Sequence, residues 1–149
     1  MKAIYLLLLL AVVSGAVLPV QAALNAKMGK AVGDPVYAAL ISFVVGSLGL
    51  LLYCILTKVE LAQISQASTV DWSVWSAGLL GAFYVAAVII LVPKIGAALT
   101  FGLVVTGQLT FSVLIDHYGL LGLSVHAFNW QRLAGIILII GGVLLIRNF

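Results

Sequence analysis

The chain has 149 residues, of which 64% are hydrophobic and 7% are charged. Soluble domains carry about 45–50% apolar and about 25% charged residues because their surfaces must be hydrated, so this composition excludes a soluble globular protein. The excess of 7 Lys and Arg over 4 Asp and Glu is too small and too scattered for a nucleic-acid-binding protein. The chain is therefore predicted to be a polytopic membrane protein.

Five segments are long and apolar enough to cross a bilayer, which takes about 20 helical residues each. They cover approximately residues 4–26, 36–57, 74–92, 95–115 and 127–146. Backbone in lipid must satisfy its hydrogen bonds within each helix, and no strand-like alternation interrupts these segments. The sequence predicts an all-α protein with a single five-helix transmembrane domain.

The first segment has two incompatible interpretations. Lys2, the apolar run that follows it and the small residues of "VQA" resemble a secretory signal peptide. The same helix can instead continue through "VQAALNA" to about 22 residues, which is the length of a span. We expect the segment to be a retained transmembrane helix.

Polar residues occur in the second half of this helix. Pro19 cannot donate a backbone hydrogen bond, which frees the carbonyl of Gly15 and favours a kink. At 100° per residue, Ser14, Gln21 and Asn25 form one stripe. Two amides on one face of a membrane helix indicate either a polar cavity or hydrogen bonds to a neighbouring helix. We expect a water-accessible substrate cavity.

The next two segments carry capping and stop signals. Asp34 can cap the second helix, and Pro35 suits its first turn. Pro93 is expected to stop the third helix, and only Pro93 and Lys94 then separate it from the fourth, which predicts a tight antiparallel hairpin. In "AGLLGAFYVAA" the aromatic Tyr84 lies beside small residues. Tyr84 is a candidate for the cavity wall, with ordinary packing as the alternative.

The fourth segment combines a packing face with another amide. Small residues recur every four positions, which allows close approach of a second helix. These residues are Ala98, Gly102, Thr106 and Thr110. Gln108 is turned away from this ladder, so it is either a further cavity amide or a satisfied packing amide. Asp116 closes the segment beside His117, and it is a candidate coupling residue or an ordinary interfacial helix end.

The basic residues are almost evenly divided between the two faces of the predicted membrane domain. One face carries Lys2, Lys58 and Arg132, and the other carries Lys27, Lys30, Lys94 and Arg147. Orientation normally follows an excess of Lys and Arg on the cytoplasmic side. The near balance leaves two interpretations open: a single orientation, or insertion in both orientations to give an antiparallel pair.

Several stretches resemble a known family of membrane proteins. "LPVQAALNAKMGKAVGDPVYAALISFVVGS", "GAFYVAAVIILVPKIGAAL", "TGQL" and "DHYGLLG" resemble the YdcZ family of the drug/metabolite transporter superfamily. The final "GIILIIGGVLLI" is similar to the dimerising helix of the small multidrug resistance exporters, where two glycines seven residues apart matter, here Gly135 and Gly142. The resemblance covers nearly the whole chain. It implies two five-helix units packed upside down to each other, around a cavity lined mainly by helices one, three and four.

One departure from the small exporters bears on mechanism. Those proteins carry an embedded Glu in the first helix that exchanges cations for protons, whereas here residues 4–26 contain no acid and Gln21 and Asn25 occupy that region. A neutral amide cannot titrate, which argues against cation–proton antiport by that route. No metal cluster, phosphate-binding loop or nucleophile with its base is recognisable, so neither an enzyme nor a metal or other cofactor is expected.

The sequence thus predicts a transporter of a small polar solute that works by alternating access in the cell membrane of a prokaryote. Its expected partners are a second, antiparallel copy, membrane lipid and the solute, and no nucleic acid. The alternatives are a non-transporting subunit or heteropair partner, and a narrow dual-topology channel.

Overall fold

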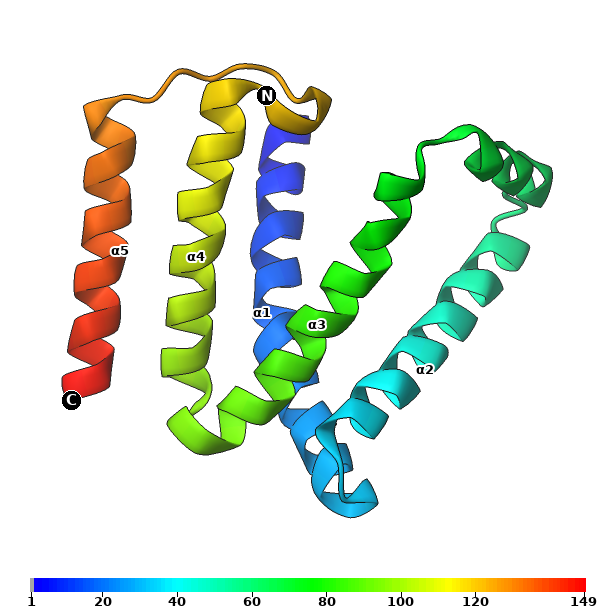
Figure 1. Cartoon of the computed structure of the whole chain (residues 1–149), viewed down its shortest axis with the longest axis horizontal. Helices are drawn as coiled ribbons and strands as arrows, with labels where there is room; N and C mark the ends of the chain where they lie inside the picture. The colour runs from blue at the N-terminus through cyan, green and yellow to red at the C-terminus, as the bar shows by residue number, and fades with distance from the viewer. Residues whose placement is uncertain (1) are drawn as a thin grey trace. The chain divides into compact units, whose positions relative to one another are not determined.

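The computed structural model describes residues 2–149, apart from the side chains of residues 2, 3 and 61. Lys2 was predicted to lie at one membrane face, and its side chain is one of those not described. Within residues 2–149 the chain is helical and contains no strand. Its five long helices are α1 (Lys2–Val32), α2 (Pro35–Leu56), α3 (Trp72–Ile95), α4 (Ala97–Tyr118) and α5 (Trp130–Asn148) (Figure 1). All five are long and apolar enough to cross a membrane, which confirms the predicted all-α fold with five spans.

The helices form two compact units, Met1–Lys94 and Ile95–Phe149. The first unit contains α1, α2 and α3, together with the 3₁₀ segment η1 (Leu61–Thr69) between α2 and α3. The second contains α4 and α5, joined through the short segment η2 (Leu120–Gly122). Each unit is internally packed, so the expectation of one five-helix domain stays a prediction.

The turn between α1 and α2 follows the predicted capping chemistry. Oδ1 of Asp34 accepts hydrogen bonds from the backbone N–H groups of Val36, at 2.6 Å, and Tyr37, at 3.3 Å. Pro35 occupies the first turn, where its missing N–H costs nothing. α1 continues to Val32, well beyond the predicted end near residue 26, because lysines near a membrane boundary do not break a helix. It ends where Gly33 adopts φ 81°.

Small residues hold the first unit together. Ala22 and Ala26 of α1 and Ala38 of α2 are buried, as is Ile89 of α3. Gly29 of α1 lies at the closest approach: a Cβ there would be 3.5 Å from Cγ2 of Ile89 and 3.5 Å from Cα of Pro35. Helices in membranes pack through such small residues because hydrophobic burial offers no driving force between them.

The end of α3 differs from the prediction. The helix was expected to stop at Pro93 but continues through it to Ile95. A proline in the last turn removes only the hydrogen bond to the carbonyl of Ile89, and the helix absorbs that loss. The break occurs instead at Gly96, which has φ 83° and joins α3 to α4 as a single non-helical residue.

In the second unit, α4 and α5 approach closely at Gly102, one residue of the predicted small-residue face, whereas Ala98 and Thr110 of that face are exposed. A Cβ on Gly102 would lie 2.8 Å from Cγ2 of Val143, so this contact requires glycine. Val143 of α5 is buried, and Thr100, on a different face of α4 from Gly102, is buried as well. Hydroxyls of α4 threonines donate to carbonyls four residues earlier: Thr100 to Gly96 at 2.7 Å, Thr106 to Gly102 at 2.8 Å and Thr110 to Thr106 at 2.8 Å.

The start of α5 also differs from the expected position near residue 127. Oδ1 of Asn129 accepts a hydrogen bond of 2.8 Å from the backbone N–H of Arg132, and the helix begins at Trp130. Asparagine is a favoured N-cap because its side-chain oxygen satisfies a free N–H of the first turn. The apolar residues before Trp130 led the sequence analysis to start this helix too early, because those residues belong to the connection between α4 and α5.

Candidate functional site

A polar groove lies within the first unit and includes Gln21. It has a volume of about 230 Å³. Its wall consists of Gln21 from α1, Ser42, Phe43, Gly46, Ser47 and Leu50 from α2, and Val85 from α3. We call it the Gln21 groove. An amide and two hydroxyls therefore border one space, within helices that are otherwise apolar.

The α2 side of the groove follows from helical spacing. Ser42, Gly46 and Leu50 recur every four residues, and Phe43 and Ser47 follow the same interval, so all five share one helix face. The sequence interpretation missed Ser42 and Ser47. The sequence feature that could have identified them is the run of small and polar residues at helical spacing in "SFVVGSLGL". This run indicates a polar face only once α2 is known to pack against α1.

The chemistry available in the Gln21 groove is neutral hydrogen bonding. Glutamine supplies two donors and an acceptor, and each serine supplies a donor and an acceptor. None of the seven lining residues carries a charge. The groove can therefore recognise hydroxyl, amide or carbonyl groups, but it has no counter-ion for a charged ligand.

The other predicted residues of α1 are distributed around the helix. Asn25 is half-buried one turn beyond Gln21 and is not part of the groove wall, and Ser14 is exposed. Pro19 is half-buried inside α1, which is continuous from Lys2 to Val32. The kink and the cavity-lining roles of Ser14 and Asn25 stay predictions.

Tyr84 of α3 contains an unsatisfied polar atom. Its hydroxyl oxygen is buried and has no hydrogen-bond partner among the described residues. A buried polar group left without a partner costs about 1–3 kcal/mol. Tyr84 directly precedes Val85 of the Gln21 groove, so the two side chains leave α3 about 100° apart. The hydroxyl needs a partner that is not supplied by the described side chains.

The remaining candidates belong to the second unit. Gln108 is exposed on α4, and a cavity shared with Gln21 stays a prediction. Gly135 and Gly142 lie on α5, and a Cβ at either position would meet nothing within 4 Å. The helix backbone is therefore accessible at both glycines in the single chain, and their role in dimerisation also stays a prediction.

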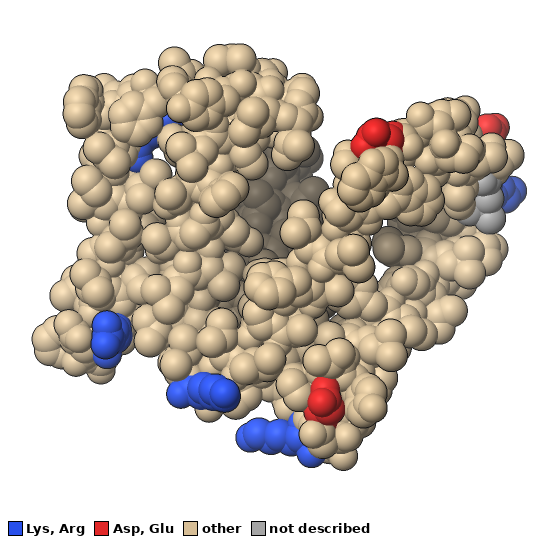
Figure 2. All heavy atoms as spheres, in the orientation of Figure 1, with Lys and Arg blue, Asp and Glu red and all other residues tan. Residues whose placement is uncertain are grey.

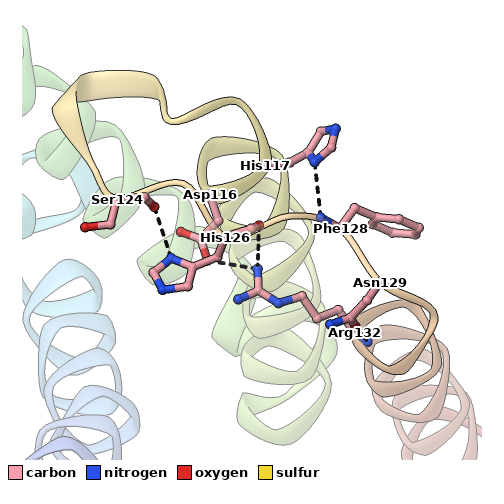
Figure 3. A network of polar contacts seen from close by, with 7 residues as sticks. All are labelled: Asp116, His117, Ser124, His126, Phe128, Asn129 and Arg132. Carbon is pink, nitrogen blue, oxygen red and sulfur yellow. Dashed lines mark hydrogen bonds and ion pairs between the residues drawn. The ribbon is translucent and has the colours of Figure 1, made fainter.

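A polar network ties the connection between α4 and α5 to the helix ends (Figure 3). Arg132 places one guanidinium nitrogen 3.1 Å from Oδ2 of Asp116 and 3.3 Å from the carbonyl oxygen of His126. The backbone N–H of His126 donates to the carbonyl of Asp116 at 2.9 Å, and that of Phe128 donates to Nδ1 of His117 at 3.1 Å. The candidate coupling residue Asp116 is thus paired with a cation, and its coupling role stays a prediction.

No metal centre is apparent in the described part of the chain. Among these residues, no group of three or more His, Cys, Asp or Glu side chains converges. The candidate site is the Gln21 groove, in which the neutral polar residues Gln21, Ser42 and Ser47 lie beside apolar ones.

Comparison with protein families gives one match, over residues 6–145, to the family described as "Putative inner membrane exporter, YdcZ". Neither the curated proteins nor the solved structures gave a match. The match covers most of the chain, including all the residues of the Gln21 groove, and confirms the resemblance seen in the sequence. With five apolar helices, it supports a multi-pass membrane protein with a transporter role. The chain belongs to the YdcZ family of inner membrane proteins.

Proposed function

We propose that the protein exports a small, polar, uncharged solute by alternating access, and that two antiparallel copies form the working unit. The observation that carries this proposal is the Gln21 groove, in which Gln21, Ser42 and Ser47 border one space inside apolar helices. The direction of transport comes from the family description, which names an exporter.

The energetic argument concerns the amide of Gln21. Moving an unpaired amide from water into hydrocarbon costs about 4–8 kcal/mol on water-to-cyclohexane scales. A glutamine in a transmembrane helix therefore needs hydrogen-bonding partners, and a groove with two serines can hold water or a polar solute that provides them. The unpartnered hydroxyl of Tyr84 adds a second group in the same unit that such a ligand could satisfy.

The neutral groove wall supports an uncharged ligand. None of the lining residues is acidic or basic, so a cation or anion would enter without a counter-ion. Polar intramembrane residues typically mark substrate pathways, and here the polarity consists of amide and hydroxyl groups alone. This agrees with the lack of an acid in residues 4–26.

The paired arrangement is supported by two features of the chain. Three basic residues of the sequence lie at one predicted membrane face and four at the other. This near balance gives little preference for one orientation. Gly135 and Gly142 leave the backbone of α5 accessible, and glycines at such positions let helices of two subunits approach closely. Inverted repeats of this kind place the substrate site near the bilayer midplane.

Counterflow in proteoliposomes tests the proposal. Vesicles containing the purified protein are loaded with a panel of sugars, polyols and amino-acid amides, and uptake of the labelled compound is followed. We expect saturable counterflow for at least one uncharged compound, and a loss of at least about ten-fold in Gln21→Leu, equivalent to one lost hydrogen bond to substrate. Val20→Leu, at an exposed neighbouring position, is the matched control.

Two results would contradict the proposal. Rapid, non-saturating ion flux would indicate a channel. The absence of counterflow for every compound, from protein that is folded and paired, would indicate a non-transporting subunit.

A further inference from the structure

Three lysines, Lys27, Lys30 and Lys94, line two adjoining hollows at one end of the first unit, where α1 ends, α2 begins and α3 ends. One hollow of about 450 Å³ is lined by Ala26, Gly29, Lys30, Pro35, Ile89, Ile90, Pro93 and Lys94. A second, of about 280 Å³, shares Ala26, Lys30 and Pro93 with it and adds Ala23, Lys27 and Val92. We call the two adjoining hollows the lysine pocket. Its larger part falls in the roughly 300–1,000 Å³ range of small-molecule sites.

The charges of the lysine pocket are not neutralised within the described chain. Lys27, Lys30 and Lys94 are exposed, and among the described residues none has a carboxylate within ion-pair distance, the one ion pair being that of Arg132 with Asp116. The nearby Asp34 directs its carboxylate at the N-terminus of α2. Figure 2 shows basic side chains projecting from this end of the first unit, with an acidic side chain beside them.

The rest of the pocket wall is apolar. Between the lysines lie Ile90, Pro93 and Ala26, with Pro35 on the α2 side. A pocket with cations at its rim and hydrocarbon on its wall matches a ligand that is anionic at one end and apolar at the other. Anionic phospholipids have this construction, and basic pockets between transmembrane helices bind their headgroups.

We propose that the lysine pocket binds the headgroup of an anionic phospholipid, with the first acyl carbons against Ile90 and Pro93. Lys30 and Lys94 line the larger hollow from two helices, and Lys30 and Lys27 line the smaller one. Lys30 and Lys94 also lie in the last turns of α1 and α3, where a positive charge stabilises the helix dipole. Lysines that only stabilise the helix dipoles would give no preference among lipids. Selective binding of anionic lipid therefore distinguishes a lipid site from this structural role. The proposal is independent of transport.

Native mass spectrometry of the detergent-purified protein tests the proposal. The protein is titrated with phosphatidylglycerol and with phosphatidylcholine that has the same acyl chains. We expect selective binding of phosphatidylglycerol and about a thirty-fold loss of its affinity in the double variant Lys30→Gln/Lys94→Gln, since each lysine near a membrane surface contributes about five-fold. Lys30→Arg/Lys94→Arg should retain binding. Lys58→Gln, in the connection beyond the other end of α2, should have no effect.

Circular dichroism and gel filtration establish that each variant is folded. If the double variant does not fold, Lys94→Gln alone should still weaken phosphatidylglycerol binding about five-fold, because this side chain is exposed. Three results would overturn the proposal: equal binding of both lipids, an equal loss in Lys58→Gln, or complete displacement of phosphatidylglycerol by millimolar inorganic phosphate. The last result would assign the lysines to free anions.

Discussion

A guanidinium nitrogen of Arg132 lies 3.1 Å from Oδ2 of Asp116, 16 positions earlier in the chain, and joins the last turn of α4 to the first turn of α5. The two side chains are 30% and 33% exposed. The same guanidinium group also binds the carbonyl of His126, so the pair fastens the connection between the helices as well as their ends. The ion pair therefore holds the ends of α4 and α5 and their connection together in the second unit.

Asp116→Asn should weaken the contact with Arg132 without preventing folding. A partly exposed ion pair contributes about 0.2–1 kcal/mol, so we expect a small loss of stability. The backbone N–H groups of His126 and Phe128 should exchange faster with deuterium in the variant. The charge swap Asp116→Arg/Arg132→Asp should restore part of their protection. If Asp116→Asn abolishes transport while exchange is unchanged, the carboxylate has the coupling role that the sequence suggested.

Asp71 should make the start of α3 sensitive to acid. Hydrogen bonding to the side chain and the backbone N–H of Ser73, the latter at 2.8 Å, lowers the pKa of the Asp71 carboxyl. A lowered folded-state pKa means that the stabilisation is present above the ordinary carboxyl value of about 3.9 and is lost as the pH falls through the folded-state value. The protection of the Ser73 amide, measured as its exchange rate relative to the intrinsic rate at the same pH, should therefore fall at low pH.

Two substitutions separate capping from charge at Asp71. Asp71→Asn should retain the cap and lose the pH dependence, because asparagine caps helices well and does not titrate. Asp71→Ala should show low protection of the Ser73 amide at every pH. The interpretation fails if Asp71→Asn keeps the acid-induced change.

Gly102→Ala should disrupt the contact between α4 and α5. The new Cβ would lie 2.8 Å from Cγ2 of Val143, a side chain with little rotamer freedom, so the helices must separate. Overpacking of this kind costs about 1–3 kcal/mol. Val143→Ala in the same chain should recover much of the loss. Gly107→Ala, where a Cβ meets nothing within 4 Å, is the matched control. Steric-trap unfolding in micelles measures the differences, and equal stability of the two glycine variants would refute the close contact.

Cysteine labelling tests the Gln21 groove. In a Cys54→Ser background, cysteines at positions 21, 25 and 42 should react with small water-soluble thiol reagents, and a bound solute should slow the reaction at 21 and 42. Leu24→Cys, whose exposed side chain leaves α1 about 60° from that of Gln21 and about 100° from that of Asn25, should react more slowly in the membrane. The reverse order of reactivity would mean that the face of α1 bearing Gln21 meets lipid, and the transport proposal would lose its site.

Gly142→Leu should weaken pairing of the subunits while leaving membrane insertion intact. The backbone at Gly142 is open, and a leucine there would hold a second helix away from it. Crosslinking in native membranes measures the dimer fraction. Gly107→Leu, at an equally open position on α4, should pair normally. Unchanged crosslinking in Gly142→Leu would remove this glycine from the dimer interface.

The number and type of helices followed from hydropathy alone, because a span needs about 20 apolar residues whatever its neighbours are. The helix ends did not, because single residues set them. Gly33 and Gly96 end α1 and α3 through positive φ angles, and Asn129 starts α5 through one hydrogen bond.

Parts of the candidate site were equally inaccessible to sequence reasoning. Gln21 was recognisable because an amide in hydrocarbon is costly. Ser42 and Ser47 were not, because serine is common in membrane helices and gains meaning only from the face that α2 presents to α1. The pairing of Asp116 with Arg132 depends on the path of the connection, which no periodicity encodes.

The threonines of α4 have a consequence for how water-accessible surfaces of this protein are recognised. Each hydroxyl donates to a carbonyl of its own helix, so Thr100, Thr106 and Thr110 present mainly their methyl groups to whatever they touch. Hydropathy scales count them as polar, yet each presents a surface that resembles that of valine. A methyl group offers water no hydrogen bond. The threonines of α4 are therefore no evidence for an aqueous path along this helix.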